Sequence, residues 1–88
     1  MIARVGYFDD FDMAGREYVV DTVKAQPGFQ GVYHLLDRSS NRALSVSFWD
    51  DEEAARSAQN AVGEARRAGG HGGPGPDRTE TYEVVRHA

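Results

Sequence analysis

The sequence contains no cysteine among its 88 residues. It therefore excludes a disulfide, a thiolate metal site and a cysteine nucleophile, and it is typical of a reducing compartment. Long apolar runs are also absent, because no segment approaches the roughly 20 apolar residues of a membrane span. The opening residues, MIARVGYFDD, lack the long apolar core of a secretion signal. We expect a cytoplasmic protein with no membrane partner.

Positive charge is scarce. Ten Lys and Arg residues are scattered among fourteen Asp and Glu residues, and the formal net charge is −4. Proteins that bind nucleic acids usually gather cations into a stripe that neutralises phosphates, so we expect no nucleic-acid partner. The one basic cluster, Arg66 with Arg67, is explained by two cations in the last turn of a helix, where they meet the negative end of the helix dipole.

Histidines and glycines give no sign of a metal or phosphate site. His34, His71 and His87 have no patterned spacing, so we expect no metal. Residues 69–76, GGHGGPGP, are rich in glycine but lack the lysine and the strand-to-helix context of a phosphate loop. We expect this segment to be a connector or a lid over a pocket. No cofactor is expected.

The order of predicted elements indicates one α+β domain over residues 1–88. Strands are predicted at residues 2–8, 29–37, 42–49 and 79–86, a helix at residues 13–25, and a second helix after Asp50. Asp50 is predicted as its N-cap, with Glu53 completing a capping box. This βαββαβ order is ferredoxin-like, with an antiparallel four-stranded sheet and two helices on one face.

The two strands predicted at residues 29–37 and 42–49 do not alternate cleanly between apolar and polar residues. In residues 29–37, Phe29, Tyr33 and Leu35 point one way, while Val32, His34 and Leu36 point the other. A half-solvated antiparallel strand would instead alternate apolar with polar residues. Two helices cover one face, so we expect the other face to pack on a second copy of the sheet, which makes the protein a homodimer.

The predicted hairpin register places most of the candidate site residues on one face of the sheet, which is either the helix-covered face or the dimer interface. If Asp37 pairs with Arg42, one face is shared by six residues: Gln30, Val32, His34, Ser45, Ser47 and Trp49. The buried stripe of the second helix consists of Ala54, Ala55, Ala58, Ala61, Val62 and Ala65, whose small side chains leave room for a cavity.

Five residues are candidates for a binding or catalytic site. His34 is suited to act as a general base near neutral pH. Ser45 is the second catalytic candidate, which would assist proton removal or stabilise the developing oxyanion. Trp49, Tyr33 and Ser47 are candidates for binding substrate, with Trp49 stacking on a flat aromatic molecule. Structural roles explain the same residues: His34 and the serines can satisfy polar groups in the core or at the dimer interface, and Trp49 and Tyr33 can serve in packing.

Residues 27–54 carry a resemblance to a known family. PGF opens the second strand, a tryptophan ends the third, and the acidic, alanine-rich run from Trp49 to Ala54 follows. This pattern resembles the antibiotic biosynthesis monooxygenase branch of the dimeric α+β barrel superfamily. The resemblance implies a homodimer of ferredoxin-like subunits with a ligand pocket between sheet and helices. Some members oxidise polyketide anthrones without metal or flavin, and others degrade haem.

Only some of the family's pocket residues have counterparts in this sequence. Trp49 corresponds to the pocket tryptophan of the anthrone oxygenases, but Ser45 and Ala55 replace their pocket asparagine and tyrosine. Gln59 stands where the haem-degrading members place an iron-ligating histidine, and residues 2–8 lack their first-strand asparagine. Haem degradation by their mechanism is therefore not expected.

Three functions follow as hypotheses. The first is a cofactor-independent monooxygenase of secondary metabolism that acts on a flat aromatic or polyketide-like molecule. The alternative is a non-catalytic homodimer that binds a small molecule or a partner, which the changes at Ser45 and Ala55 favour. An isomerase or cyclase of the same superfamily is the third, and an acid or base deep in the pocket would mark it.

Overall fold

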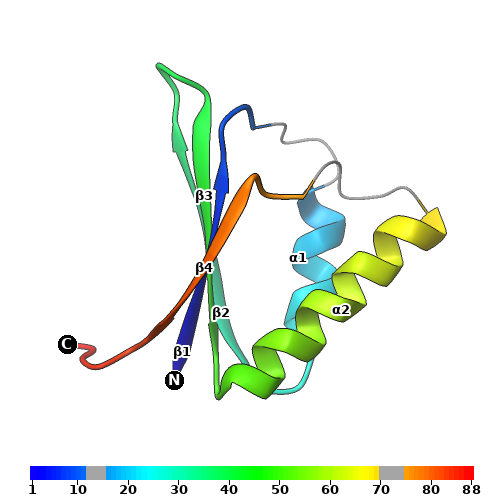
Figure 1. Ribbon diagram of the computed structural model, residues 1–88, viewed down its shortest axis with the longest axis vertical. Coiled ribbons are helices and arrows are strands. Elements are labelled where there is room, and N and C mark those ends of the chain that lie inside the picture. The colour runs from blue at the N-terminus through cyan, green and yellow to red at the C-terminus, as the bar shows by residue number, and fades with distance from the viewer. Residues whose placement is uncertain (12–15, 70–74) are drawn as a thin grey trace.

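The computed structural model of the chain describes residues 1–11, 16–69 and 75–88. Its elements are β1 (Ile2–Phe8), α1 (Arg16–Lys24), β2 (Phe29–Asp37), β3 (Arg42–Trp49), α2 (Glu52–Gly69) and β4 (Arg78–Glu83). The four strands form one sheet in the order β2-β3-β1-β4 with antiparallel neighbours. Both helices lie on one side of it (Figure 1). The predicted ferredoxin-like α+β fold is confirmed. None of the described helices has the length and hydropathy to cross a membrane.

The hairpin between β2 and β3 has the predicted register, with Asp37 opposite Arg42. A register shift between Phe29 and Gly31 nevertheless makes the first residues of β2 irregular. Such a bulge adds one residue to a strand. The residues before the bulge therefore point to the face opposite to the one that simple alternation predicts. Phe29 packs against Trp49 on the helix side, whereas Gln30 is exposed and donates a hydrogen bond to Asp50. The predicted faces of Phe29 and Gln30 were therefore wrong.

Several element boundaries differ from the prediction. The expected start of α1 at Met13 lies outside the described residues, and the helix ends at Lys24. Strand β4 ends at Glu83 instead of residue 86, because Glu83 pairs with Ile2, where its partner strand β1 begins. Of the predicted loop at residues 69–76, Gly69 belongs to α2 and residues 70–74 lie outside the described part.

The cap of α2 is shifted by one residue from the prediction. The carboxylate of Asp51 accepts a hydrogen bond from the backbone N–H of Ala54, with a distance of 2.8 Å between donor and acceptor. Asp51 is therefore the N-cap. Asp50 is used elsewhere, since its N–H donates to the carbonyl of Gly28 at 2.9 Å and its side chain accepts from Gln30. The predicted capping box of Asp50 and Glu53 was wrong.

A glycine lets the connection before β2 pass under the start of α2. Gly28 has a φ of 83°, a conformation that side chains disfavour, and a Cβ built there would lie 2.7 Å from the Cβ of Ala54. The two constraints together explain why a glycine stands at position 28. This crossing fixes the position of Trp49 relative to α2.

The core consists of two separate clusters at opposite ends of the helix-covered face. One contains Trp49, Ala55 and Ala58, with Val23, Phe29 and Ala54 packed against it. The other contains Phe8, Phe11 and Ala43, with Leu36 against it. Between these clusters the facing residues of the sheet are polar, as the register shows for His34, Ser45 and Ser47. The apolar core is therefore interrupted in the middle of the sheet.

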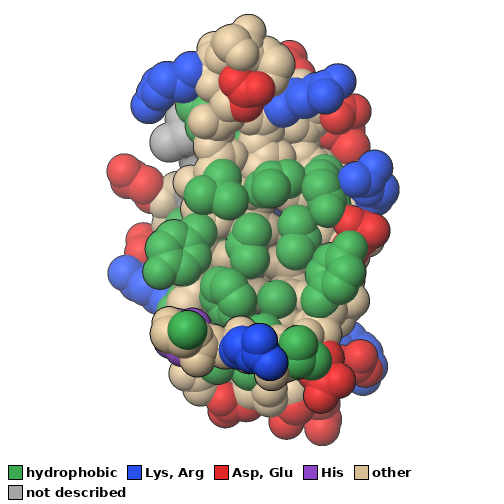
Figure 2. Space-filling view, turned by 90° about the vertical axis from the view of Figure 1, so that its left-hand side faces the viewer, with side chains coloured by type: hydrophobic (Ala, Val, Ile, Leu, Met, Phe, Trp, Pro, Cys, Tyr) green, Lys and Arg blue, Asp and Glu red, His purple; other side chains and the backbone are tan. Residues whose placement is uncertain are grey.

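The other face of the sheet is open and largely apolar. Figure 2 shows hydrophobic side chains spread across this face, with charged groups mainly at its edges. The cross-strand register places on it nine apolar residues: Ala3, Val5, Tyr7, Tyr33, Leu35, Leu44, Val46, Phe48 and Tyr82. Tyr33, Leu35 and Tyr82 are 65%, 49% and 50% exposed. A single copy of the chain thus leaves this face uncovered.

Candidate functional site

A pocket of about 110 Å³ lies between the helix-covered face of the sheet and the two helices. The interruption of the core described above forms its floor. Its floor residues are Arg4, Gly6, His34, Ser45, Ser47 and Thr79, and its roof includes Val19, Val23, Ala58, Gln59, Val62 and Arg66. Trp49 lines one end of the pocket and Phe8 and Phe11 line the other.

His34 and Ser45, the two predicted catalytic residues, are brought together by the sheet. They are directly opposite each other in the β2–β3 register, and such pairs have Cβ atoms about 4.5–5.5 Å apart. The ring of His34 lies edge-on to Phe11, with 6.1 Å between ring centroids. His34 is half-buried, so its imidazole borders both the apolar cluster of Phe11 and the polar floor.

Trp49 is 1% exposed and is the largest fully buried side chain among the described residues. Its indole Nε1–H donates to the hydroxyl of Ser47 at 2.9 Å, and its ring lies edge-on to Phe29 at 5.5 Å. Trp49 thus serves both in core packing and in the pocket wall. The bond also fixes Ser47, whose hydroxyl holds the indole and has one lone pair and its own proton left for a ligand.

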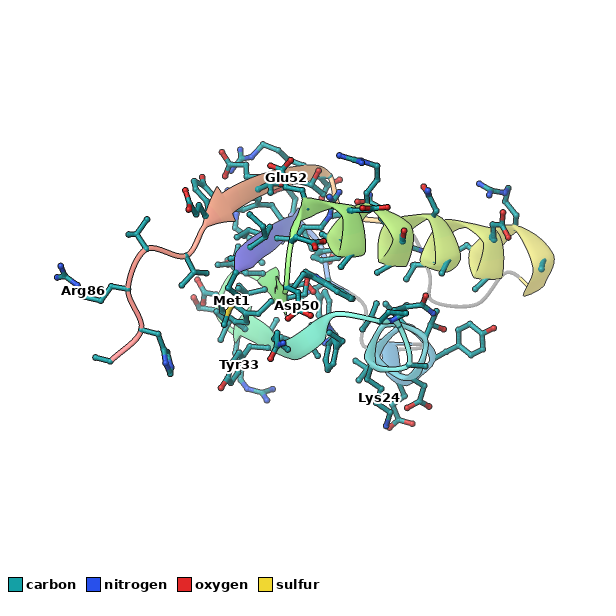
Figure 3. All side chains as sticks on the ribbon, turned by 90° about the horizontal axis from the view of Figure 1, so that it is seen from below. Met1, Lys24, Tyr33, Asp50, Glu52 and Arg86 are labelled. Carbon is teal, nitrogen blue, oxygen red and sulfur yellow. The ribbon has the colours of Figure 1, made fainter. Side chains whose placement is uncertain are left out.

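Tyr33, which was predicted to bind substrate, lies outside the pocket. It is on the open face, 65% exposed, and its ring lies edge-on to Phe48 at 6.4 Å. In the edge-on view of the sheet in Figure 3, Tyr33 lies away from the two helices. The correction follows from the pleat, because residues next to each other in a strand point to opposite faces, and Tyr33 precedes the pocket residue His34.

Arg4 and Arg66 line the pocket and were missed as site residues. Burial lowers the pKa of Arg4 from its ordinary value, because desolvation disfavours the charged form. The Nε of Arg66 is buried and has no hydrogen-bond partner among the described residues. A signal for Arg4 was available: it has the same parity in residues 2–8 as buried Phe8, so it had to share that face.

The comparisons with known proteins found structures of the same shape. MhuD from Mycobacterium tuberculosis is described as a haem degrader with two haems in its active site, and a variant of it binds two manganese protoporphyrins per active site. That variant is 23% identical, with a TM-score of 0.74 over 100% of this chain and 98% of its own. No model of a protein family matches the sequence, and no curated protein matches it.

Two further structures agree. SnoaB from Streptomyces nogalater, a cofactor-independent oxygenase, is 19% identical, with a TM-score of 0.69 over 98% of this chain and 94% of its own. A candidate antibiotic biosynthesis monooxygenase from Chloroflexus aurantiacus is 15% identical, with a TM-score of 0.61 over 99% and 96% of the two chains. The chain therefore has the fold of the antibiotic biosynthesis monooxygenases. At these identities the likeness establishes the fold alone.

The α2 side of this pocket offers no imidazole for haem iron. Gln59 lines it from α2, and a glutamine lacks the imidazole that holds haem iron in many proteins. Among the described lining residues the one imidazole is that of His34, which lies across the pocket on the sheet and against Phe11. The described residues also contain no group of three His, Cys, Asp or Glu side chains that could hold a metal ion.

Proposed function

We propose that the protein is a cofactor-independent monooxygenase of secondary metabolism that acts on a small, flat aromatic molecule. The observation that carries the proposal is the pocket, in which a tryptophan wall adjoins a floor where His34 and Ser45 are direct neighbours. SnoaB, whose fold the chain shares, is a cofactor-independent oxygenase. We further propose that the protein works in the cytoplasm as a homodimer.

The size of the pocket restricts the substrate. An engineered cavity of about 150 Å³ binds benzene, so a pocket of about 110 Å³ suits about one aromatic ring. A polyketide-like molecule with three rings would have to widen it. Apolar walls from Val19, Val23 and Val62 favour a flat, apolar ring over a sugar or a nucleotide.

The proposed reaction oxidises an activated CH2 group beside an aromatic ring to a carbonyl. His34 removes one proton from the carbon as general base, and the substrate carbanion then reduces dioxygen and forms a C–O bond as a hydroperoxide. Loss of the second C–H proton and cleavage of the O–O bond give the ketone and one water. Ser45 donates a hydrogen bond to the oxygen on which negative charge develops. Trp49 orients the ring, and the apolar walls exclude water.

The second candidate is a non-catalytic homodimer that binds a small molecule. The Nε1–H of Trp49 is used by Ser47, and Ala55 on α2 offers the pocket only a methyl group. These features remove two of the polar groups that a catalytic pocket of this kind would use. A binding protein needs no proton transfer, so this candidate explains the pocket without a catalytic role for His34.

Oxygen uptake separates the two candidates. The fluorescence of Trp49, the single tryptophan, first selects ligands from a panel that runs from 2-tetralone to anthrone, all with a CH2 beside an aromatic ring. An oxygen electrode then measures uptake with each ligand that quenches saturably. We expect one dioxygen consumed per ketone formed, and a loss of about 100-fold in kcat for His34→Gln. His87→Gln, an exposed histidine outside the pocket, is the matched control and should retain full activity.

One result would contradict the monooxygenase, and another would contradict only the role of His34. Saturable quenching without oxygen uptake would establish the binding protein in its place. Uptake that survives His34→Gln unchanged would remove His34 as the base. A further variant, Trp49→Phe, tests the pocket role of the indole. If the indole binds the ligand, this variant should still fold but should bind the aromatic ligand more weakly.

A further inference from the structure

The pocket has a positive charge that contrasts with the molecule as a whole. The chain carries a formal net charge of −4, yet Arg4 and Arg66 both line the pocket, and none of its described lining residues is Asp or Glu. Arg4 extends from the middle of β1, opposite Ser47. Arg66 extends from the last turn of α2. Two cations from different elements thus face the same pocket.

Neither guanidinium has a carboxylate partner within the described residues. In residues 1–11, 16–69 and 75–88 the one ion pair joins Lys24 to Asp21 at the surface of α1. The Nε of Arg66 is buried without a hydrogen-bond partner among these residues. A buried donor that is left unpaired costs stability, and folded proteins satisfy nearly all such groups. A donor of this kind beside a pocket indicates that a ligand completes it.

Arg66 and its neighbour Arg67 have different surroundings. The guanidinium of Arg66 lies near the backbone before β4, since a Cβ built on Gly75 would be 3.2 Å from its Nη1, and the side chain lines the pocket. Arg67 is exposed and does not line the pocket. The cation of Arg66 therefore lies at the pocket, while Arg67 is in solvent near the end of the helix.

We propose that the pocket takes an aromatic carboxylate, with the ring beside Trp49 and the carboxylate bound by Arg66 and Arg4. This inference rests on the proposed function, since it specifies the substrate class of the same pocket. The guanidinium of arginine is planar and matches the two oxygens of a carboxylate. An apolar surrounding strengthens such a pair. Ser47, opposite Arg4, is placed to donate its remaining proton to the same group.

The test compares benzoate with benzamide, which has nearly the same shape, no charge and the single ring that the pocket accommodates. Isothermal titration calorimetry measures both affinities for the full-length protein. A charge-assisted hydrogen bond contributes more than a neutral one, so we expect benzoate to bind about tenfold tighter or more. Arg66→Met and Arg4→Met should each remove most of this preference and leave the affinity for benzamide within about twofold.

Arg67→Met is the matched control, because it removes the same charge from the neighbouring position outside the pocket. It should keep the preference for benzoate. Equal affinities for the two compounds in the wild type, or an equal loss in Arg66→Met and Arg67→Met, would overturn the carboxylate site and leave the aromatic pocket standing. Binding of neither compound would overturn both this inference and the proposed function. Thermal unfolding of each variant shows that the comparison concerns folded protein.

Discussion

Arg66 and Arg67 are neighbours in sequence but have different surroundings. Both lie in the last turn of α2, where a cation interacts favourably with the helix dipole. Arg67 is exposed, whereas Arg66 lines the pocket and holds a buried Nε without a partner in the described residues. The helix dipole explains why basic residues occur in this turn, but it does not explain why Arg66 lines the pocket. A binding site for an anion would explain the position of Arg66.

Arg66→Met should stabilise the free protein. The variant keeps a long side chain and removes a buried, unpaired donor, whose cost is about 1–3 kcal/mol. Arg67→Met loses the same interaction with the dipole, about 0.3–1 kcal/mol, without this gain. In urea unfolding followed by circular dichroism, we expect a higher free energy of unfolding for Arg66→Met than for Arg67→Met. Equal values would mean that the Nε of Arg66 is hydrated in solution.

At the scale of elements, two adjacent aspartates at the start of α2 make different hydrogen bonds. Asp51 caps the helix by accepting from the N–H of Ala54. Asp50 joins the end of β3 to the start of β2 through Gly28 and Gln30. Figure 3 shows Asp50 at the end of the sheet from which α2 departs. The two side chains therefore hold the sheet and the helix in the arrangement that encloses Trp49.

Asp51→Ala should lower the free energy of unfolding by about 1 kcal/mol, the usual cost of losing an N-cap. Glu53→Ala serves as control, because this exposed residue of the first turn contributes only its interaction with the dipole, about 0.3–1 kcal/mol and at the low end when salt screens it. Urea unfolding measures both. A larger loss for Glu53→Ala than for Asp51→Ala would instead support a capping box formed by Asp50 and Glu53.

Sequence patterns predicted the elements better than their exact contacts. Strand periodicity gave the register of Asp37 with Arg42 and the shared face of His34, Ser45 and Trp49, because the pleat fixes which residues point together. It failed at Gln30, where the strand has a register shift. The signal was Gly31, because a glycine inside a strand often marks a bulge. The pocket arginines were missed for another reason: a charged residue is usually solvated, and only the packing of α2 on the sheet shows which arginine is enclosed.

At the scale of the whole molecule, the sheet has two faces with different tasks. One face carries the pocket beneath the helices, and the other exposes the apolar residues of four strands to solvent. Monomeric proteins rarely expose a contiguous apolar patch of this kind without a function for it. The chain after β4 also projects on the side of the open face (Figure 1). Both features support the proposed homodimer.

Val46 lies near the centre of the open face, opposite Val5 on one side and Tyr33 on the other. We expect the wild type to sediment as a dimer at micromolar concentration and Val46→Lys to sediment as a monomer. A buried, unpaired ammonium at the centre of an apolar interface costs several kcal/mol, enough to shift the dissociation constant by about three orders of magnitude. Tyr18→Lys places the same charge on exposed Tyr18 of α1, away from this face, and should leave the dimer intact. Analytical ultracentrifugation across a concentration series measures all three proteins. A wild type that remains monomeric at high micromolar concentration would overturn the homodimer, and the pocket on the opposite face would then belong to a single chain.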